Sequence, residues 1–496
     1  MKSYRPYNPS QSYLLPPSPS EWLPEGHLVY FVLDLVEGLD LSAIERKLQA
    51  KDPRGERSYA PRMMTALLVY GYATGVFSSR RIARATYEDV GFRVLAANEH
   101  PHFTTVHAFH SMHREALAAL FYQVLRTCQK AGLAKLGQVA IDGTKMKANA
   151  SKHKAMSHER MLKDEARLKA EIEALLARAA NADAAEDAEY GVGKEPEDVP
   201  AELQRREDRL AKIRAAREAL EQEAAAARAA ELIAMADDLR AKVADPTTSP
   251  RDQAAFTTRA AQHDQHAAEL DDDDRDPPPP GSDDDLPRHT PPTDPDGTPK
   301  PTAQRNFTDP DSRIMLRDGG FLQAYNAQIA VDEDHQIIVA AAVGNQAPDA
   351  EYFEPMLERI VDNCDAVPTC ITADAGYFSA DNVHAAEHMG TEPFIAVGRH
   401  RRDGTPDTLP IFKSGSEELV RMRATLLSPR GRAIYARRKS TVEPVFGQIR
   451  AARGFHHFSF RCLFKTRCEW LFVCLTHNLL KLYRATVGAP PLAALA

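Results

Sequence analysis

Secretion signals, long apolar runs and closely spaced cysteine pairs are all absent from this sequence. The first twenty residues hold no apolar core of the kind that a secretory signal needs. The longest apolar run near the C-terminus, residues 471–480, is too short to span a bilayer and is interrupted by His477 and Asn478. None of the six cysteines belongs to a C-x-x-C pair. These absences predict a cytoplasmic protein that has reduced thiols and no membrane partner.

Charge is distributed unevenly along the chain. Its 496 residues, 43% hydrophobic and 27% charged, are typical of a soluble protein with two to four domains. The net charge of −8 conceals an acidic segment, residues 151–300, with 35 acids against 22 lysines and arginines. Residues 399–467 are basic instead, with 16 lysines and arginines against five acids. This basic segment is compatible with a polyanionic partner or with a solvated basic surface.

The N-terminal quarter has the pattern of a helical domain. Residues 1–25 are rich in proline and serine and predict an extended arm. Residues 26–132 then show apolar side chains at helical spacing, including a buried helix at 60–72 with Pro61 in its first turn. Arginines on the following helix are compatible with a helix-turn-helix that reads DNA ends, and a plain helical bundle is the alternative.

A charged insertion follows. Residues 150–270 place Leu, Ile and Ala at three- and four-residue steps among charged residues, which predicts two arms of a helical hairpin or coiled coil. Residues 271–305 are acidic and proline-rich and predict a disordered linker.

Strand-like runs and helices alternate over the rest of the chain. Once the insertion is removed, their order is that of an α/β, ribonuclease-H-like domain with a mixed five-stranded sheet, formed by residues 133–149 and 306–460. The C-terminal residues 461–496 then predict a helix that packs on this domain. The five expected strands lie at 139–141, 321–331, 336–343, 369–373 and 393–397.

Three carboxylates mark a candidate site on this domain. Asp142 and Asp374 end the first and fourth expected strands, and Glu443 lies on a helix that could close over the same edge. Three acids around one point suit a pair of Mg²⁺ ions about 4 Å apart that grip a phosphodiester. The alternatives are two turn aspartates and a surface ion pair between Lys439 and Glu443.

Three segments resemble the DDE transposases of bacterial insertion sequences, in particular the branch with a helical N-terminal domain and a charged helical insert. They read IDGTK at 141–145, ITADAGY at 371–377 and YARRKSTVEPVFGQIR at 435–450. The resemblance implies that Asp142, Asp374 and Glu443 bind two Mg²⁺ ions, with Mn²⁺ able to substitute. The residues that it implies on DNA phosphates are Lys145, Tyr435, Arg438, Lys439 and Arg450.

The resemblance also implies an activity. The protein would bind the terminal inverted repeats of its element, as a homodimer assembled on DNA in the bacterial nucleoid, cut the DNA and join the freed 3′-hydroxyl to target DNA. Three alternatives stay open. They are a nuclease of the same fold without strand transfer, a non-catalytic DNA-binding protein, and an assembly scaffold built around the insertion.

Overall fold

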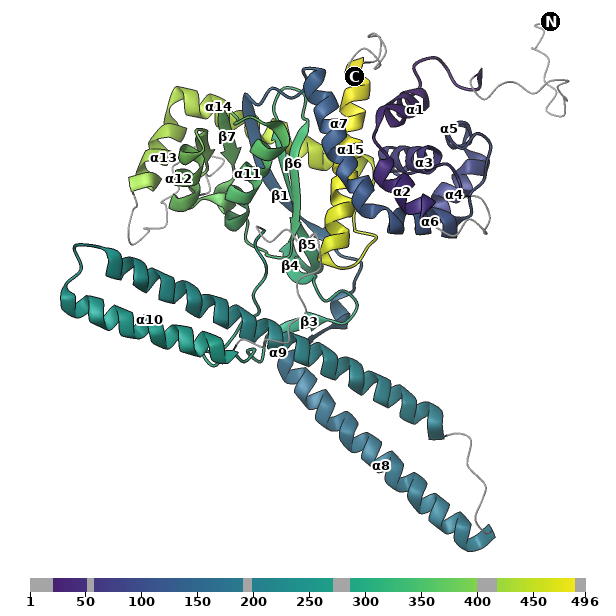
Figure 1. The fold of residues 1–496 in the computed structure, drawn as a ribbon. Helices are drawn as coiled ribbons and strands as arrows, with labels where there is room; N and C mark the ends of the chain where they lie inside the picture. The colour runs from purple at the N-terminus through teal and green to yellow at the C-terminus, as the bar shows by residue number, and fades with distance from the viewer. Residues whose placement is uncertain (1–20, 51–57, 191–198, 271–285, 399–416, 487–496) are drawn as a thin grey trace, which may run out of the picture.

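Three regions make up the computed structural model, which describes residues 21–50, 58–190, 199–270, 286–398 and 417–486. In Figure 1 a helical N-terminal region lies beside a mixed α/β region, and three long helices extend away from both. None of the described helices combines the length and the apolar composition that crossing a membrane requires.

Short helices form the N-terminal region. The helix expected at 60–72 is α3, in which Pro61 occupies the first turn and ten residues are buried. Pro at this position loses no hydrogen bond, because the first N–H groups of a helix have no partner within it. The described helices of this region are α1 (Leu28–Gly38), α2 (Ser42–Gln49), α3 (Pro61–Ala73), α4 (Ser79–Glu88), α5 (Val90–Leu95), α6 (Phe103–Met112) and α7 (Arg114–Lys130).

A mixed sheet forms the centre of the α/β region. Its strands lie in the order β4-β5-β1-β7-β8, and β6 also pairs with β5. The pairs on the β5 side of β1 are antiparallel, whereas β1, β7 and β8 are parallel to one another. The strands are β1 (Gln138–Lys147), β4 (Arg313–Arg317), β5 (Gly320–Asp332), β6 (Ile338–Gly344), β7 (Cys370–Ala373) and β8 (Glu392–Ile395).

The expectation of five strands was wrong by one. The additional strand is β4, which pairs with the first residues of β5 through Arg317↔Gly320 and Arg313↔Ala324. β6 pairs with the later part of the same strand, from Asn326 to Val331. Both strands therefore occupy one edge of a long β5.

Helices cover both faces of this sheet. α11 (Phe353–Cys364), α12 (Ala380–His388), α13 (Glu417–Leu427) and α14 (Pro429–Gly447) lie in the α/β region, and α15 (Leu463–Thr486) packs against both β6 and α7. Trp470 of α15 donates from Nε1 to the carbonyl oxygen of Gln328 on β5, at 3.1 Å. Asn478 exchanges two 2.8 Å hydrogen bonds with the backbone of Ile338 on β6. These bonds fasten α15 to the sheet, because a buried edge strand needs partners for its backbone groups.

The insertion contains three long helices instead of the two expected. α8 (His158–Tyr190) and α10 (Pro250–Leu270) each lie against a different part of α9 (Val199–Ala244), which gives the two arms seen in Figure 1. Buried Leu210 and Ile213 of α9 form one apolar cluster with Met161 and Leu168 of α8. Two antiparallel helix pairs therefore share one central helix.

The linker expected to be disordered is ordered over the part that the structure describes. Residues 271–285 lie outside the described residues, but Leu286 and Ala303 are 2% and 1% exposed. β3 (Gln304–Asn306) pairs with β2 (Ala155–Ser157) as a small antiparallel sheet. Because these two strands lie at the two ends of the insertion, they close its base.

Candidate active site

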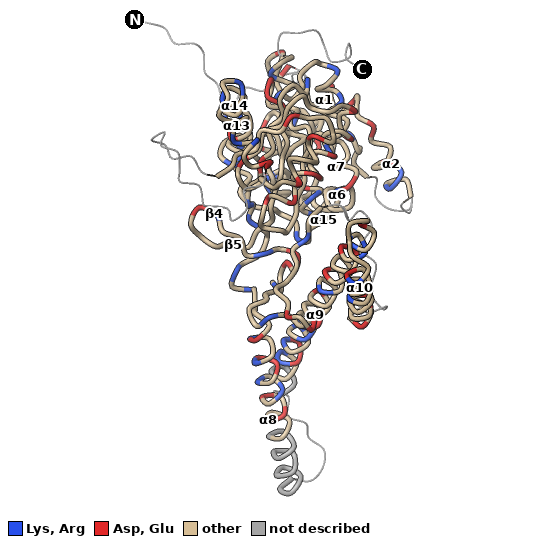
Figure 2. Tube along the Cα trace, turned by 90° about the vertical axis from the view of Figure 1, so that its left-hand side faces the viewer, with Lys and Arg blue, Asp and Glu red and all other residues tan. Residues whose placement is uncertain are grey.

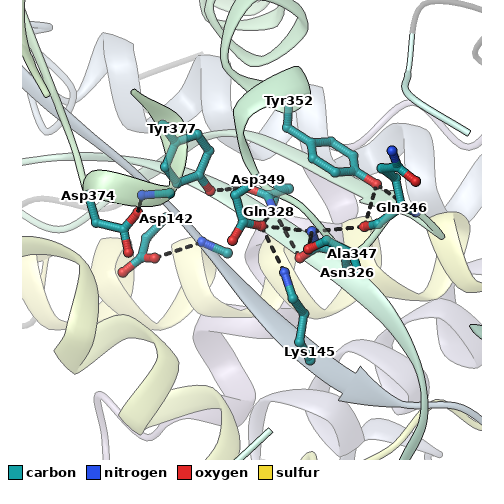
Figure 3. Close-up of polar contacts among 12 residues, drawn as sticks. Asp142, Lys145, Asn326, Gln328, Gln346, Ala347, Asp349, Tyr352, Asp374 and Tyr377 are labelled. Atoms are coloured by element: carbon teal, nitrogen blue, oxygen red, sulfur yellow. Dashed lines mark hydrogen bonds and ion pairs between the residues drawn. The ribbon is translucent and has the colours of Figure 1, made fainter. Parts of the chain in front are cut away.

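The register of two parallel strands brings Asp142 and Asp374 together. On β1 and β7, Ala140 is paired with Thr372. Each aspartate lies two residues beyond its member of this pair, so both side chains point to the same face of the sheet. Neighbouring strands lie about 4.8 Å apart, which places the two carboxyl groups next to each other at the end of β7. Figure 3 shows them side by side.

The expectation that Asp142 ends its strand was wrong. β1 continues to Lys147, because its other edge stays paired with β5 as far as Lys147↔Ala324. The pairing with β7 stops earlier, since Ala373 is the last residue of that strand. Asp142 therefore lies inside a long strand, at the point where one of its two neighbours ends.

Burial and charge act on Asp142 in opposite directions. Its pKa is raised to about 6, mainly because burial disfavours the charged form and also because Asp374 adds a like charge. Arg438 opposes this shift, with Nη1 3.2 Å from Asp142 Oδ2. The backbone N–H of Gly143 donates to the other oxygen at 2.8 Å. In mild acid, Asp142 therefore populates both its charged and its neutral form.

A tight turn fixes Asp374. Its Oδ1 accepts a 2.8 Å hydrogen bond from the N–H of Gly376, in the short helix η4 (Ala375–Tyr377). A Cβ at position 376 would lie 3.0 Å from Asp374 Oδ1 and 3.6 Å from Asp349 Oδ2. Glycine thus keeps the space between these two carboxylates open.

Asp349 is a third carboxylate beside this pair. Its Oδ1 accepts hydrogen bonds from Asn326 at 2.7 Å, Lys145 at 2.8 Å and Gln328 at 2.9 Å. Figure 3 shows Asp349 between Lys145 and the two aspartates. Nothing in the local sequence shows which strands the side chain of Asp349 will face.

Glycine and tyrosine allow the Asp349 network to form. A Cβ on Gly143 would collide with the side chain of Gln328, so glycine lets this amide lie across β1. The buried hydroxyl of Tyr377 donates to the amide oxygen of Gln328, which leaves the amide nitrogen to donate to Asp349. The amide orientation is therefore set by two partners on opposite sides.

Two arginines from the C-terminal helices reach β1. Arg438 of α14 is buried, and its guanidinium carbon lies 5.9 Å from the ring centroid of Tyr435. Arg450 donates from Nη1 to Thr144 Oγ1 at 3.3 Å, from the π-helical turn η5 (Gln448–Ala452). The Nε atoms of both arginines are buried without a hydrogen-bond partner within the described parts of the chain. Such donors suit an anionic ligand.

The other residues expected on α14 point elsewhere. Lys439 and Glu443 are exposed, and among the described residues neither forms an ion pair with the other or contacts the aspartates. Glu443 lies five residues beyond Arg438, which corresponds to about 140° around a regular helix. The structure therefore brings Asp142, Asp374, Lys145, Arg438 and Arg450 to one place, with Tyr435 against Arg438, but not Lys439 or Glu443.

The donor set is suited to a hard cation. Asp142 and Asp374 offer only oxygen, and Mg²⁺ in proteins is commonly held by one or two carboxylates together with water and substrate phosphate. Within the described ranges, no group of three His, Cys, Asp or Glu side chains is arranged to hold an ion by itself. Asp142 and Asp374 therefore fit a metal site with two protein carboxylates, in which water and substrate phosphate supply further ligands.

Two family models match the chain. One, described as a transposase DDE domain, covers residues 296–479 and so includes Asp374 and Glu443. The other, described as a transposase domain, covers residues 17–111 in the helical N-terminal region. No curated protein and no solved structure matches the chain.

Both family models describe domains of transposases. The chain belongs to the DDE transposases of bacterial insertion sequences. Its partner is accordingly DNA, and members of the family generally use divalent metal ions.

Proposed function

We propose that this transposase cuts DNA at the terminal inverted repeats of its element and joins the freed 3′-hydroxyl to target DNA. The observation that carries the proposal is the juxtaposition of Asp142, inside β1, with Asp374, directly after the end of β7. The strand order β6-β5-β1-β7-β8 supports it, because this is the order of the ribonuclease-H-like fold. The alternative, a nuclease of the same fold, would cut DNA without joining strands.

Asp142 and Asp374 would hold the metal, which we take to be two Mg²⁺ ions, and Glu443 would complete the ligand set. Bound there, divalent ions supply Lewis-acid stabilisation of the attacking and leaving oxygens of a phosphodiester. Arg438 favours the ionised form of Asp142 in its buried position, and in this form the carboxylate can serve as a ligand.

The regular hydrogen bonding of α14 is interrupted near Glu443. Pro444 has no N–H to donate to the carbonyl of Ser440, and this carbonyl instead accepts a 2.9 Å hydrogen bond from Gln336. The π-helical turn η5 begins four residues later, at Gln448. We propose that α14 adjusts here when DNA binds and brings Glu443 to the aspartates.

Cations around the pair would hold the DNA backbone. Lys145 extends from β1, and Arg438 and Arg450 lie beside this strand. Their ammonium and guanidinium groups would contact phosphates next to the scissile bond. Tyr435 supports the guanidinium of Arg438, and exposed Lys439 would contact a phosphate further along. Such contacts fix the register of the DNA, not its sequence.

We assign the remaining regions as follows. Residues 26–132 would bind the DNA ends, residues 133–149 and 306–460 would form the catalytic domain, and residues 461–496 would pack on it. The insertion, residues 150–270, would support assembly of a homodimer on DNA.

Single carboxylate variants test the proposal. Asp142→Ala, Asp374→Ala and Glu443→Ala should each bind terminal-repeat DNA with wild-type affinity and fail to cut it in Mg²⁺. Glu387→Gln is the matched control, because Glu387 is a carboxylate of the same region that pairs with Arg421 on the surface. A variant that still cuts removes its residue from the site, and cleavage without strand transfer by the wild type favours the nuclease.

A further inference from the structure

Two hollows join at the root of the insertion. The first, of about 670 Å³, is lined by residues that include Lys147, Lys152 and Lys154. The second, of about 570 Å³, lies beside the starts of α8 and α9 and is lined by Arg160, Arg205 and Lys212, among others. His153 and Lys154 line both. We call this surface the root groove and define it by these cations: Lys147, Lys152, Lys154, Arg160, Arg205 and Lys212.

The cations of the root groove have no acidic partners, unlike most others on the insertion. Within the described part of the chain, none of the six forms an ion pair. Elsewhere on α8, α9 and α10 the pairing is dense: Arg217 contacts Glu165 and Glu221, and Arg240 contacts Asp237 and Asp264. Because residues 151–300 carry a net charge of −13, a cluster of unpaired cations there is not a consequence of composition.

The side chains of the root groove are placed to meet a ligand in solution. All six are exposed, and among the residues that line the second hollow Asp208 is the single described carboxylate. Figure 2 shows stretches of Lys and Arg where the insertion meets the body of the molecule. An exposed surface with one sign of charge raises the local concentration of the opposite charge.

β1 connects the root groove to the active site. β1 carries Asp142, Lys145 and Lys147 in turn, and Lys147 lines the first hollow. Five residues of strand span about 17 Å, so the groove begins about half a helical turn of DNA away from the aspartates. A duplex with one phosphodiester at Asp142 and Asp374 therefore has phosphates within reach of this surface.

We propose that the root groove binds the phosphate backbone of the DNA duplex that lies in the active site. This inference rests on the proposed function, because it takes the duplex to be the one that is cut. It assigns the insertion a direct contact with substrate, in addition to a part in assembly. The contacts are to phosphates, so they add affinity and fix position without reading sequence.

A charge-matched pair of variants of the full chain tests the inference. The root variant carries Lys152→Gln, Lys154→Gln, Arg205→Gln and Lys212→Gln. The control variant carries Lys163→Gln, Arg228→Gln, Arg240→Gln and Lys242→Gln, which remove the same charge from ion-paired positions of the same insertion. Fluorescence anisotropy measures the Kd of each for a labelled duplex about 30 base pairs long, three helical turns, over a series of KCl concentrations.

The root variant should bind at least ~10-fold more weakly at low salt. Its plot of log Kd against log salt should be shallower by about 3.6, since each of the four phosphate contacts that it loses contributes about 0.9 to that slope. The control should bind within about twofold of the wild type. Equal binding by the root variant and the wild type, or equal losses in both variants, overturns the inference.

Two further measurements separate the outcomes. If the root variant binds polyglutamate or duplex RNA more weakly than the wild type does but binds duplex DNA equally well, the groove is a site for another polyanion and the DNA assignment fails. The salt series is also repeated with Asp142→Ala. If that variant still cuts DNA, the proposed function fails. The salt dependence still tests separately whether the root groove binds DNA phosphates.

Discussion

Arg438 Nη1 lies 3.2 Å from Asp142 Oδ2, and both side chains are largely buried, with 8% and 16% of their surfaces exposed. The pair joins α14 to the central strand of the sheet. Arginine is suited to this position, because its charge persists when it is buried and its several donors can serve a carboxylate and a phosphate together.

Arg438→Gln should therefore reduce DNA cleavage by about 100-fold, the size of effect seen when one charge-stabilising donor is removed from an active site. Single-turnover cleavage in saturating Mg²⁺ measures this loss. Arg437→Gln is the control, because Arg437 is 65% exposed and pairs with Glu333 away from the aspartates. Equal rates for the two variants would remove Arg438 from the site.

Asp349→Asn should lower both activity and stability. Oδ1 of Asp349 accepts hydrogen bonds from Lys145, Asn326 and Gln328. An asparagine here loses the ion pair with Lys145. If its NH₂ group takes the place of Oδ1, it faces these three donors and leaves them without an acceptor. We expect a loss of about 2 kcal/mol in the free energy of unfolding and about tenfold in cleavage rate. Asp365→Asn, which breaks the exposed pair with Arg126, should cost less than about 1 kcal/mol and leave cleavage unchanged.

Gly376→Ala should block the site while the fold persists. Its methyl group would lie 3.0 Å from Asp374 Oδ1, in the space between that carboxylate and Asp349. Cleavage should fall at least ~10-fold, with a change in unfolding free energy below about 1 kcal/mol. Gly447→Ala is a useful contrast in stability, because a Cβ at this helical position meets no atom within 4 Å, and should stabilise the protein by about 0.5–1 kcal/mol.

His477 should make the protein less stable in mild acid. Its ring is 2% exposed, is hydrogen-bonded to the carbonyl of Gln336 at 2.9 Å, and has its pKa lowered to about 3 by burial and by cationic Arg453, Lys481 and Arg484. Below pH 6.5 the unfolded chain takes up a proton at this residue and the folded chain does not. The free energy of unfolding should therefore fall as pH falls from 6.5 towards 3, by up to about 1.4 kcal/mol per pH unit from this group.

Urea unfolding between pH 4.5 and 7 measures this dependence. His477→Gln should have a pH slope smaller by about one proton, whatever its absolute stability. An unchanged slope in His477→Gln would show that the buried ring is not neutral in the folded state.

Apolar runs were sufficient to predict the central strands, and their ribonuclease-H-like order predicted that Asp142 and Asp374 would meet. They could not predict that β1 continues past Asp142, since Gly143, Thr144 and Lys145 are not apolar and pair only because β5 is long. The role of Asp349 depends on donors from β1 and β5, which are distant in the chain. Such contacts exist only in the folded protein.

The helices, too, could be predicted only in part from the sequence. Helical spacing predicted α8 and α9, but α10 is rich in alanine and has few large apolar residues, so its pattern alone did not distinguish it. A regular helical repeat would place Lys439, Glu443 and Arg450 on one face. In the structure Arg450 lies beyond Pro444 in a π-helical turn and contacts Thr144, while Glu443 faces solvent. Departures from the regular helical repeat are a property of local packing and are not visible in periodicity.

The unbroken course of α9 has a mechanical consequence. Its 46 residues span about 69 Å, and the helices packed along its two parts take their directions from this one axis. Adding or deleting a single residue near its middle would turn one arm relative to the other by about 100°. The number of residues in α9 therefore determines the orientation of the two arms relative to each other.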